Sequence, residues 1–262
     1  MDLSETFKIF YEIKKSDSIF KKKFLLIKIC LYYQPHGKSI KDNHQVLQEY
    51  YTLYMRYRIV FKKKEEKIFT WLKLLEEHMN AIEEDYHNHT DFLLFLHSLL
   101  LIGMLKADKN IIQNVHGRVI DYMDNNILRS GYFKNAYEHD CLGYQINDLR
   151  NLFYLIGDLK KYGFYHFNYL ERKTVTGGSL LKSFKYLVPF IEKKKTKYEF
   201  LNSIFQDDLH HAEFGKPWNV QEGILLFYEC KSLHKKIEHL NNLYFLNKAN
   251  GNSNFFSFHS SK

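Results

Sequence analysis

Apolar residues recur at every third or fourth position through most of the chain, which is the spacing of one face of an α-helix. The clearest stripes are Phe20, Phe24, Ile27 and Leu31, then the apolar positions from Val46 to Tyr54, and then those from Ile68 to Met79. We expect each stripe to be the buried side of a helix. No segment shows the strict alternation of apolar and polar residues that is typical of a half-buried strand.

The middle of the chain predicts longer helices with recognisable ends. Residues 92–105 are apolar almost all round, which indicates a central helix buried on every side, and Asp91 is placed to cap it. Further amphipathic helices are expected at residues 111–128, 142–159 and 180–191. Ser130-Gly131 would end the first of these, because glycine suits the left-handed position after a helix, and Ser179 would cap the last.

The C-terminal part of the chain continues the helical pattern. Residues 196–205 and 220–243 are expected to be helical, with a loop at residues 210–218 between them. Residues 248–262 lack a helical period and predict a disordered tail. No linker rich in Pro, Gly or Ser interrupts the chain before that tail. The sequence therefore predicts a single all-α domain over residues 1–247, with helices paired antiparallel through short turns.

The net charge favours an anionic partner. Lys and Arg outnumber Asp and Glu by 38 to 30, which gives a formal charge of +8 and a pI near 9.1. Nucleic acids, membrane surfaces and acidic polysaccharides all suit such a chain. The lysine runs are short and typical of solvated helix ends, and no nucleic-acid-binding motif accompanies them, so no nucleic-acid partner is expected.

Other classes of site have little support in the sequence. The cysteines are odd in number and widely spaced: Cys30, Cys141 and Cys230. Neither a disulfide framework nor a zinc site is therefore predicted, and His210-His211 has no carboxylate or thiol at a ligand spacing. The apolar stretch at residues 24–33 is too short to span a bilayer. With no signal peptide visible, we expect the chain as given to be cytoplasmic, and no feature predicts an oligomeric state.

Two groups of polar, titratable residues stand beside apolar helices. His87-Asn88-His89 precedes the helix at residues 92–105, and residues 137–140, which include His139, precede the helix that carries Tyr144. A tyrosine can act as an acid or a base if nearby cations lower its pKa. Each group also has a structural interpretation, in which the first only caps a helix and Tyr144 is a buried phenol bonded to a carboxylate.

Several segments resemble the alginate lyase family of polysaccharide lyases. They are Asn88-His89 before the buried helix, Gly131-Tyr132-Phe133, the stretch from Glu138 through His139 and Tyr144 to Leu149, the helix from Gly178 to Phe190, and Phe214 to Trp218. The segments occur in the family's order over residues 65–225. The resemblance implies an incomplete α/α toroid of antiparallel helix pairs, with a cleft for a polymer.

The resemblance also implies an activity, which is cleavage of a uronate-containing polysaccharide by β-elimination without a metal or other cofactor. Carried over by position, Asn88 would bind the sugar carboxylate, His89 would neutralise it or take the C5 proton, and Tyr144 would act as base, acid or both. His139 stands where many relatives have an arginine, which replaces a permanent charge with a titrating one. The resemblance implies a periplasmic or secreted protein if a leader is missing from the sequence.

Further residues are candidates for substrate binding: Arg129, Gln145, Arg150 and Trp218. The arginines can bind a carboxylate through two parallel hydrogen bonds, and the indole can stack on a sugar ring, although each is also a common surface or packing residue. The rival hypothesis is a non-catalytic helical domain that binds an acidic glycan or another polyanion without cleaving it. The lyase hypothesis requires Asn88, His89, His139 and Tyr144 to converge on one cleft.

Overall fold

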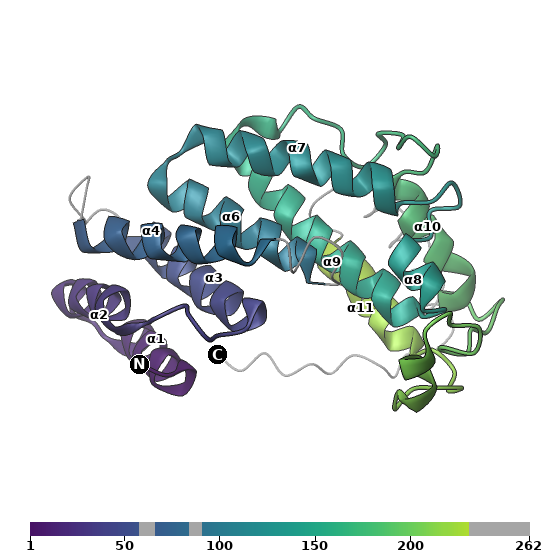
Figure 1. The fold of residues 1–262 in the computed structure, drawn as a ribbon, viewed down its shortest axis with the longest axis horizontal. Helices are drawn as coiled ribbons and strands as arrows, with labels where there is room; N and C mark the ends of the chain where they lie inside the picture. Colours follow the sequence, from purple (N-terminus) through teal and green to yellow (C-terminus); the bar gives the residue numbers. More distant parts are fainter. Residues whose placement is uncertain (58–65, 84–90, 231–262) are drawn as a thin grey trace, which may run out of the picture. The chain divides into compact units, whose positions relative to one another are not determined.

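The structure is a computed structural model that describes residues 1–57, 66–83 and 91–230 (Figure 1). Within these ranges it is helical, and the β contacts are isolated bridges between Ile127 and Phe133 and between Tyr198 and Pro217. The all-α prediction is thus confirmed for these ranges. The predicted tail at 248–262, the predicted helix beyond Cys230, and the Asn88-His89 pair lie outside the described residues.

The chain divides into two compact units. Of the described residues, unit 1 comprises 1–57, 66–83, 91–122 and 158–167, and unit 2 comprises 123–157 and 168–230. Two of the boundaries fall inside helices, in α7 (Lys109–Asn126) and in α9 (Leu142–Leu159). This is why the sequence, searched for a linker rich in Pro, Gly or Ser, shows no sign of a division.

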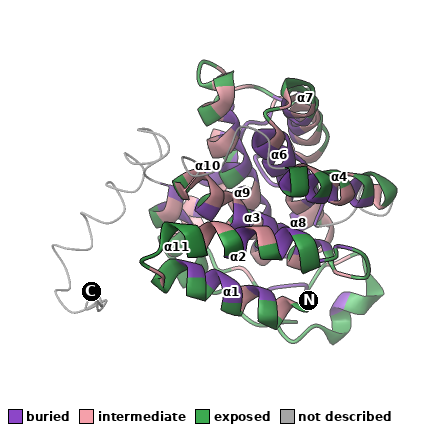
Figure 2. Cartoon of the chain, turned by 90° about the vertical axis from the view of Figure 1, so that its left-hand side faces the viewer, coloured by how far each residue is buried: buried purple, intermediate pink, exposed green. Residues whose placement is uncertain are grey.

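In unit 1 the helices pack around α6 (Phe92–Lys106). Both α3 (Ile40–Tyr57) and α4 (Glu66–Ala81) contact α6, whereas α1 (Leu3–Lys15) and α2 (Ile19–Tyr32) contact each other and α3. Nearly every residue of α6 is buried, and its ribbon is almost wholly purple in Figure 2. The predicted central helix is therefore confirmed, as is the predicted buried stripe of α4 from Ile68 to Met79.

The start of α6 differs from its prediction in one respect. Asp91 occupies the N-cap position, but its side chain makes no capping hydrogen bond. Its carboxylate lies 3.6 Å from the ammonium group of Lys41 on α3. The carboxylate faces a neighbouring helix, so the predicted position is right and the predicted bond is wrong.

The predicted buried stripe of α2 is also wrong. Phe20, Phe24 and Leu31 are 82%, 67% and 45% exposed, respectively. The side of α2 that packs against its neighbours is instead formed by Leu25, Leu26, Ile29 and Cys30. Because α2 is apolar on opposite sides, periodicity alone could not tell which side faces the core.

Unit 2 holds α8 (Lys134–Glu138), most of α9, α10 (Leu180–Ile191), the 3₁₀-helix η3 (Gln206–His210) and α11 (Val220–Cys230). The bounds of α9 and α10 match the prediction. The hydroxyl of Ser179 accepts a hydrogen bond from the backbone N–H of Lys182 at 3.2 Å, which confirms the predicted cap of α10. Helices α10 and α11 contact each other.

The predicted helix at residues 196–205 is absent, and this prediction is wrong. The segment forms turns, and Phe200 adopts a positive φ of 64°. Its backbone donors bond to other parts of unit 2: the N–H of Phe200 donates to the Asp140 carbonyl and that of Ile204 to the Glu138 carbonyl, each at 3.0 Å. Hydrogen bonds to distant chain segments override the local preference for a helix here.

Helix α7 ends two residues earlier than predicted, at Asn126 rather than Leu128. Gly131 has a φ of +90°, as expected of a glycine placed after a helix, although it belongs to the turn that follows. A Cβ at this position would lie 2.4 Å from the carbonyl carbon of Lys182. Glycine is needed here because the backbone of α10 passes too close for any side chain.

Cys30, Cys141 and Cys230 are all free thiols in buried positions.

Among the residues that the structure describes, no helix has both the length and the apolar character required to cross a membrane.

Candidate functional site

The predicted residues His139 and Tyr144 lie together in unit 2. His139 is the C-terminal cap of α8, and Tyr144 stands in the first turn of α9. Their ring centroids are 4.5 Å apart, and the imidazole also stacks on Phe205 at 4.2 Å. The short turn between α8 and α9 therefore brings an imidazole and a phenol into contact.

A carboxylate that the sequence did not single out fixes the imidazole. The Nδ1 atom of His139 lies 2.6 Å from the Oδ2 atom of Asp208, which is on η3 and is 6% exposed. The hydroxyl of Ser203 donates to the same oxygen. Because a carboxylate only accepts, the neutral imidazole carries its proton on Nδ1, and Nε2 is left with an open lone pair.

The other imidazole nitrogen of His139, Nε2, has no hydrogen-bond partner among the described residues. The side chain is 18% exposed. Ser203 bonds to the carboxylate rather than to Nε2, so the group is not arranged as a nucleophilic triad. What the geometry provides is an oriented proton acceptor beside a phenol.

The electrostatic environment of Tyr144 does not lower the pKa of its phenol. Burial raises this pKa, and the carboxylate of Asp208, the thiol of Cys141 and the carboxylate of Asp148 raise it further. The condition for Tyr144 to act as a base, a pKa lowered by nearby cations, is therefore not met among the described residues. At neutral pH the phenol keeps its proton and is suited to act as an acid.

The loop at residues 197–208 holds this cluster against the start of α9. The side chain of Glu199 accepts a hydrogen bond from the backbone N–H of Leu142 at 3.1 Å and so caps α9 from a distant part of the chain. Asp140 has a positive φ of 52°, and its carboxylate bonds to Lys197 and to the backbone N–H of Asn202. These contacts set the position of Asp208 relative to His139.

Gln145, predicted to bind substrate, is fully buried. Its Oε1 atom accepts from the backbone N–H of Phe133 at 2.7 Å, and its Nε2 atom donates to the Gly131 carbonyl at 3.1 Å. The amide thus joins the chain before α8 to α9, which is a structural role.

The other predicted binding residues differ in how accessible they are. Arg150 donates to the carboxylate of Glu229 at 2.8 Å. Trp218 is 7% exposed and packs so closely on Gly223 that a Cβ there would lie 2.5 Å from the indole. Arg129 is exposed and forms no ion pair with any described carboxylate, so it is the candidate that is open to a ligand.

The predicted pair Asn88 and His89 lies outside the described residues, so the convergence of all four proposed catalytic residues stays a prediction. The sequence missed Asp208 and Ser203. Asp208 is 69 positions from His139, and no local spacing could have linked them. The described residues contain no group of three potential ligands placed to hold a metal ion.

A second histidine cluster lies in unit 1. The Nε2 atom of His44 on α3 lies 3.0 Å from the Nδ1 atom of His97 on α6, whose own Nε2 atom is 2.9 Å from the Oδ2 atom of Asp158. Lys161 bonds to the other oxygen of Asp158 at 2.7 Å. Burial, and then the neighbouring His97, lowers the pKa of His44 to about 3.

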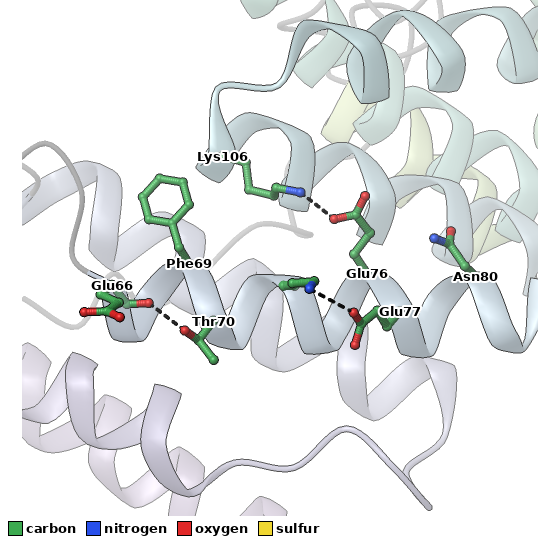
Figure 3. Close-up of a pocket in the computed structure, with 8 residues that line it drawn as sticks. Glu66, Phe69, Thr70, Glu76, Glu77, Asn80 and Lys106 are labelled. Atoms are coloured by element: carbon green, nitrogen blue, oxygen red, sulfur yellow. Dashed lines mark hydrogen bonds and ion pairs between the residues drawn. The ribbon is translucent and has the colours of Figure 1, made fainter.

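A shallow hollow in unit 1 contains none of the predicted residues. It has a volume of about 560 Å³ and runs along α4, with Lys106 of α6 at its edge (Figure 3). Lys106 pairs with Glu76 and Lys73 with Glu77, which leaves Glu66 as the lining charge with no ion pair among the described residues. Since most of its charges are neutralised in pairs, this hollow is a poor candidate for binding a charged ligand.

Comparison of the chain with protein-family models, with curated proteins and with solved structures finds no match in any of the three.

Proposed function

We propose that the His139–Tyr144 cluster is the acid–base site of a lyase that cleaves a uronate-containing polysaccharide by β-elimination, on an incomplete α/α toroid. The observation that supports this most is the contact of the two rings, with His139 oriented by Asp208. Elimination needs one group that removes a proton and one that donates a proton, both within reach of a single sugar linkage.

The two side chains suit different halves of that reaction. The open Nε2 atom of His139 takes the C5 proton, and the electrons of the C5–H bond form a double bond between C4 and C5. The bond from C4 to the bridging oxygen breaks, and the phenol of Tyr144 gives its proton to that oxygen. The raised pKa of Tyr144 favours this assignment, because the phenol is protonated at the start of the cycle. The protonated imidazole then gives up its proton to solvent and the phenolate takes one from solvent, which restores both groups.

The C5 proton becomes removable only if the neighbouring sugar carboxylate is neutralised. By resemblance, Asn88 and His89 would bind this carboxylate, and the exposed guanidinium of Arg129 is a further candidate. The net charge of +8 would attract an anionic polymer to the protein. No metal or other cofactor is required by this scheme.

The rival function, binding of an acidic glycan without cleavage, is favoured by a different observation. Arg150 is paired with Glu229 and Trp218 is buried, so two of the predicted substrate contacts are occupied inside unit 2. A protein that had lost the chemistry but kept its positive charge would still hold a polyanion.

The two functions are separated by one assay. The protein is incubated with several uronate polymers, and the ultraviolet absorbance of the unsaturated product is followed. Tyr144→Phe removes the proton donor and should abolish product formation, whereas His210→Gln, a change at an exposed histidine two positions after Asp208, should not. Polymer binding without product would support the rival, and an unchanged rate for Tyr144→Phe would contradict the proposed site.

A further inference from the structure

Helix α2 carries apolar residues on a side that faces solvent. Phe20, Phe24, Ile27 and Leu31 recur at helical spacing and lie opposite the packed side of the helix. We call this set the outer α2 face. Phe20 and Phe24 are 82% and 67% exposed, and Figure 2 shows exposed and buried positions alternating along α2. A helix that is apolar on both sides usually has a partner on both.

The outer α2 face is cationic as well as apolar. Helix α2 contains Lys21, Lys22, Lys23 and Lys28 and no acidic residue. Lys21 and Lys28 are exposed, lie beside the face and form no ion pair within the described ranges. Exposed aromatic rings with lysines beside them and no opposing acid are the composition of helices that lie in the surface of an anionic bilayer.

From this charge pattern we propose that the outer α2 face docks on an anionic lipid surface, with Phe20 and Phe24 inserted at the level of the headgroups. The helix would lie in the plane of the interface, since the described residues include no helix suited to span a bilayer. Phe20 and Phe24 would leave water, and Lys21 and Lys28 would remain at the level of the lipid phosphates.

Two other occupants suit the face less well. A second copy of the chain, paired through the same face by a two-fold axis, would bring the lysines of one α2 against those of the other, and α2 itself has no acidic residue to pair with them. An acidic polysaccharide would satisfy the lysines and could stack on the phenylalanine rings, but it would leave the aliphatic side chains of Ile27 and Leu31 with little apolar surface to contact. An anionic membrane satisfies both features.

The first test measures binding of the full chain to vesicles of phosphatidylcholine alone and to vesicles of equal parts phosphatidylcholine and phosphatidylglycerol. We expect binding to the anionic vesicles only, weakened by added salt. Phe20→Ser with Phe24→Ser should reduce this binding at least about tenfold. Lys21→Glu with Lys28→Glu should reduce it about as much, because each lysine near such a surface contributes noticeably to binding.

The matched control is Tyr165→Ser with Val175→Ser, which removes side chains that are 64% and 87% exposed but lie outside α2. The control should bind as the unchanged protein does, and thermal unfolding should show that all variants are folded. Absence of binding to anionic vesicles, or equal loss in the control and in the Phe20/Phe24 variant, would overturn the proposal. The proposal would also be overturned if the unchanged protein formed a concentration-dependent dimer, lost in the Phe20/Phe24 variant, and bound no lipid.

A second measurement separates insertion from simple adsorption of charge. Tryptophan fluorescence of Phe24→Trp should shift to the blue when anionic vesicles are added, because the indole leaves water. Tyr165→Trp should show no such shift. Binding of both variants with no shift in either would indicate that the phenylalanines stay in water, and would contradict docking by the outer α2 face.

Discussion

Each unit of the molecule contains a histidine bonded to an aspartate, and the two pairs differ in what surrounds them. In unit 2, His139 lies 2.6 Å from Asp208 and its other nitrogen is open. In unit 1, His97 lies 2.9 Å from Asp158, is 3% exposed, and has its second nitrogen bonded to His44. A histidine bonded to an aspartate thus forms a proton acceptor with an open nitrogen in unit 2. In unit 1 the same kind of pair belongs to a buried network of hydrogen bonds.

This difference assigns the pairs different tasks. A proton acceptor can serve a substrate only if one lone pair is open and solvent or ligand can reach it. A buried chain in which each polar atom has a partner stabilises the packing of helices and is costly to interrupt. Substitutions in the unit 2 pair should therefore change activity, and those in the unit 1 pair should change stability.

The largest effect is expected for His139→Gln. If His139 is the proposed base, product formation from a uronate polymer should fall about 10²-fold to 10⁴-fold. The free energy of unfolding, measured by urea denaturation, should fall by about 1–2 kcal/mol, less than for His97→Leu, because the glutamine amide can still donate a hydrogen bond to the carboxylate of Asp208. A rate of product formation within a few-fold of that of the unchanged protein would show that the His139–Asp208 pair does not serve the reaction.

His97→Leu is expected to have the opposite profile. The change removes the hydrogen-bond partner of the His44 imidazole. It also removes one of the two partners that the Asp158 carboxylate has among the described residues, so that Lys161 remains as the other. We expect the protein to lose about 2–4 kcal/mol of unfolding free energy, measured by urea denaturation. Activity per folded molecule should be retained at low denaturant. A loss of activity without a loss of stability would show that the unit 1 pair also serves a substrate.

The next effect concerns pH and depends on His44. Its pKa of about 3 in the folded protein is below the ordinary value of 6.5, because burial disfavours the charged imidazole. Below pH 6.5 the unfolded chain therefore binds the proton more readily than the folded chain does. The contribution of His44 to the free energy of unfolding is therefore fully present above pH 6.5. It declines as the pH falls below that value, by about 1.4 kcal/mol for each pH unit.

We expect about 2–3 kcal/mol of stability to be lost between about pH 6 and about pH 4, measured by urea denaturation at each pH. His44→Gln keeps a hydrogen-bonding group but cannot be protonated, so it should flatten this part of the curve. Asp158, whose pKa is lowered by His97 and Lys161 against the opposing effect of burial, adds a loss of stability at still lower pH. An equal slope in both proteins would show that His44 is not the titrating group.

The smallest effect is expected for Lys161→Ala. This lysine bonds to the outer oxygen of Asp158, but its side chain is 66% exposed. An ion pair with so much contact with water contributes less than about 1 kcal/mol to stability, and added salt should weaken that contribution. A larger loss in thermal or urea unfolding would mean that the unit 1 network depends on its surface charge as well as on its buried hydrogen bonds.

Much of the helical structure was predictable from the sequence because its signals are local. The bounds of α10 follow from the cap at Ser179 and the apolar period after it, and the burial of α6 follows from its almost unbroken apolar composition. The outer α2 face was misjudged because the helix has two apolar sides. The segment at 196–205 was misjudged because its backbone bonds to Glu138 and Asp140, which local propensity cannot reveal.

The candidate site was predictable only in its contiguous part. His139 and Tyr144 are near in sequence, and the turn between α8 and α9 brings them together. The partner of His139 was not predictable, since Asp208 reaches it through a loop whose path depends on tertiary contacts. The raised pKa of Tyr144 was not predictable for the same reason, because Asp208 is one of the groups that raise it.

The cap that Glu199 provides for α9 has a consequence for the order of folding. The carboxylate and the N–H group of Leu142 are separated by 57 positions, so during synthesis the helix leaves the ribosome well before its cap. Until the later segment arrives, the backbone donors of its first turn, which carries Tyr144, can bond to water but not to the Glu199 carboxylate. The neighbourhood of Tyr144 is therefore completed late, and a chain released before Asp208 is made would contain α9 without an assembled His139 pair.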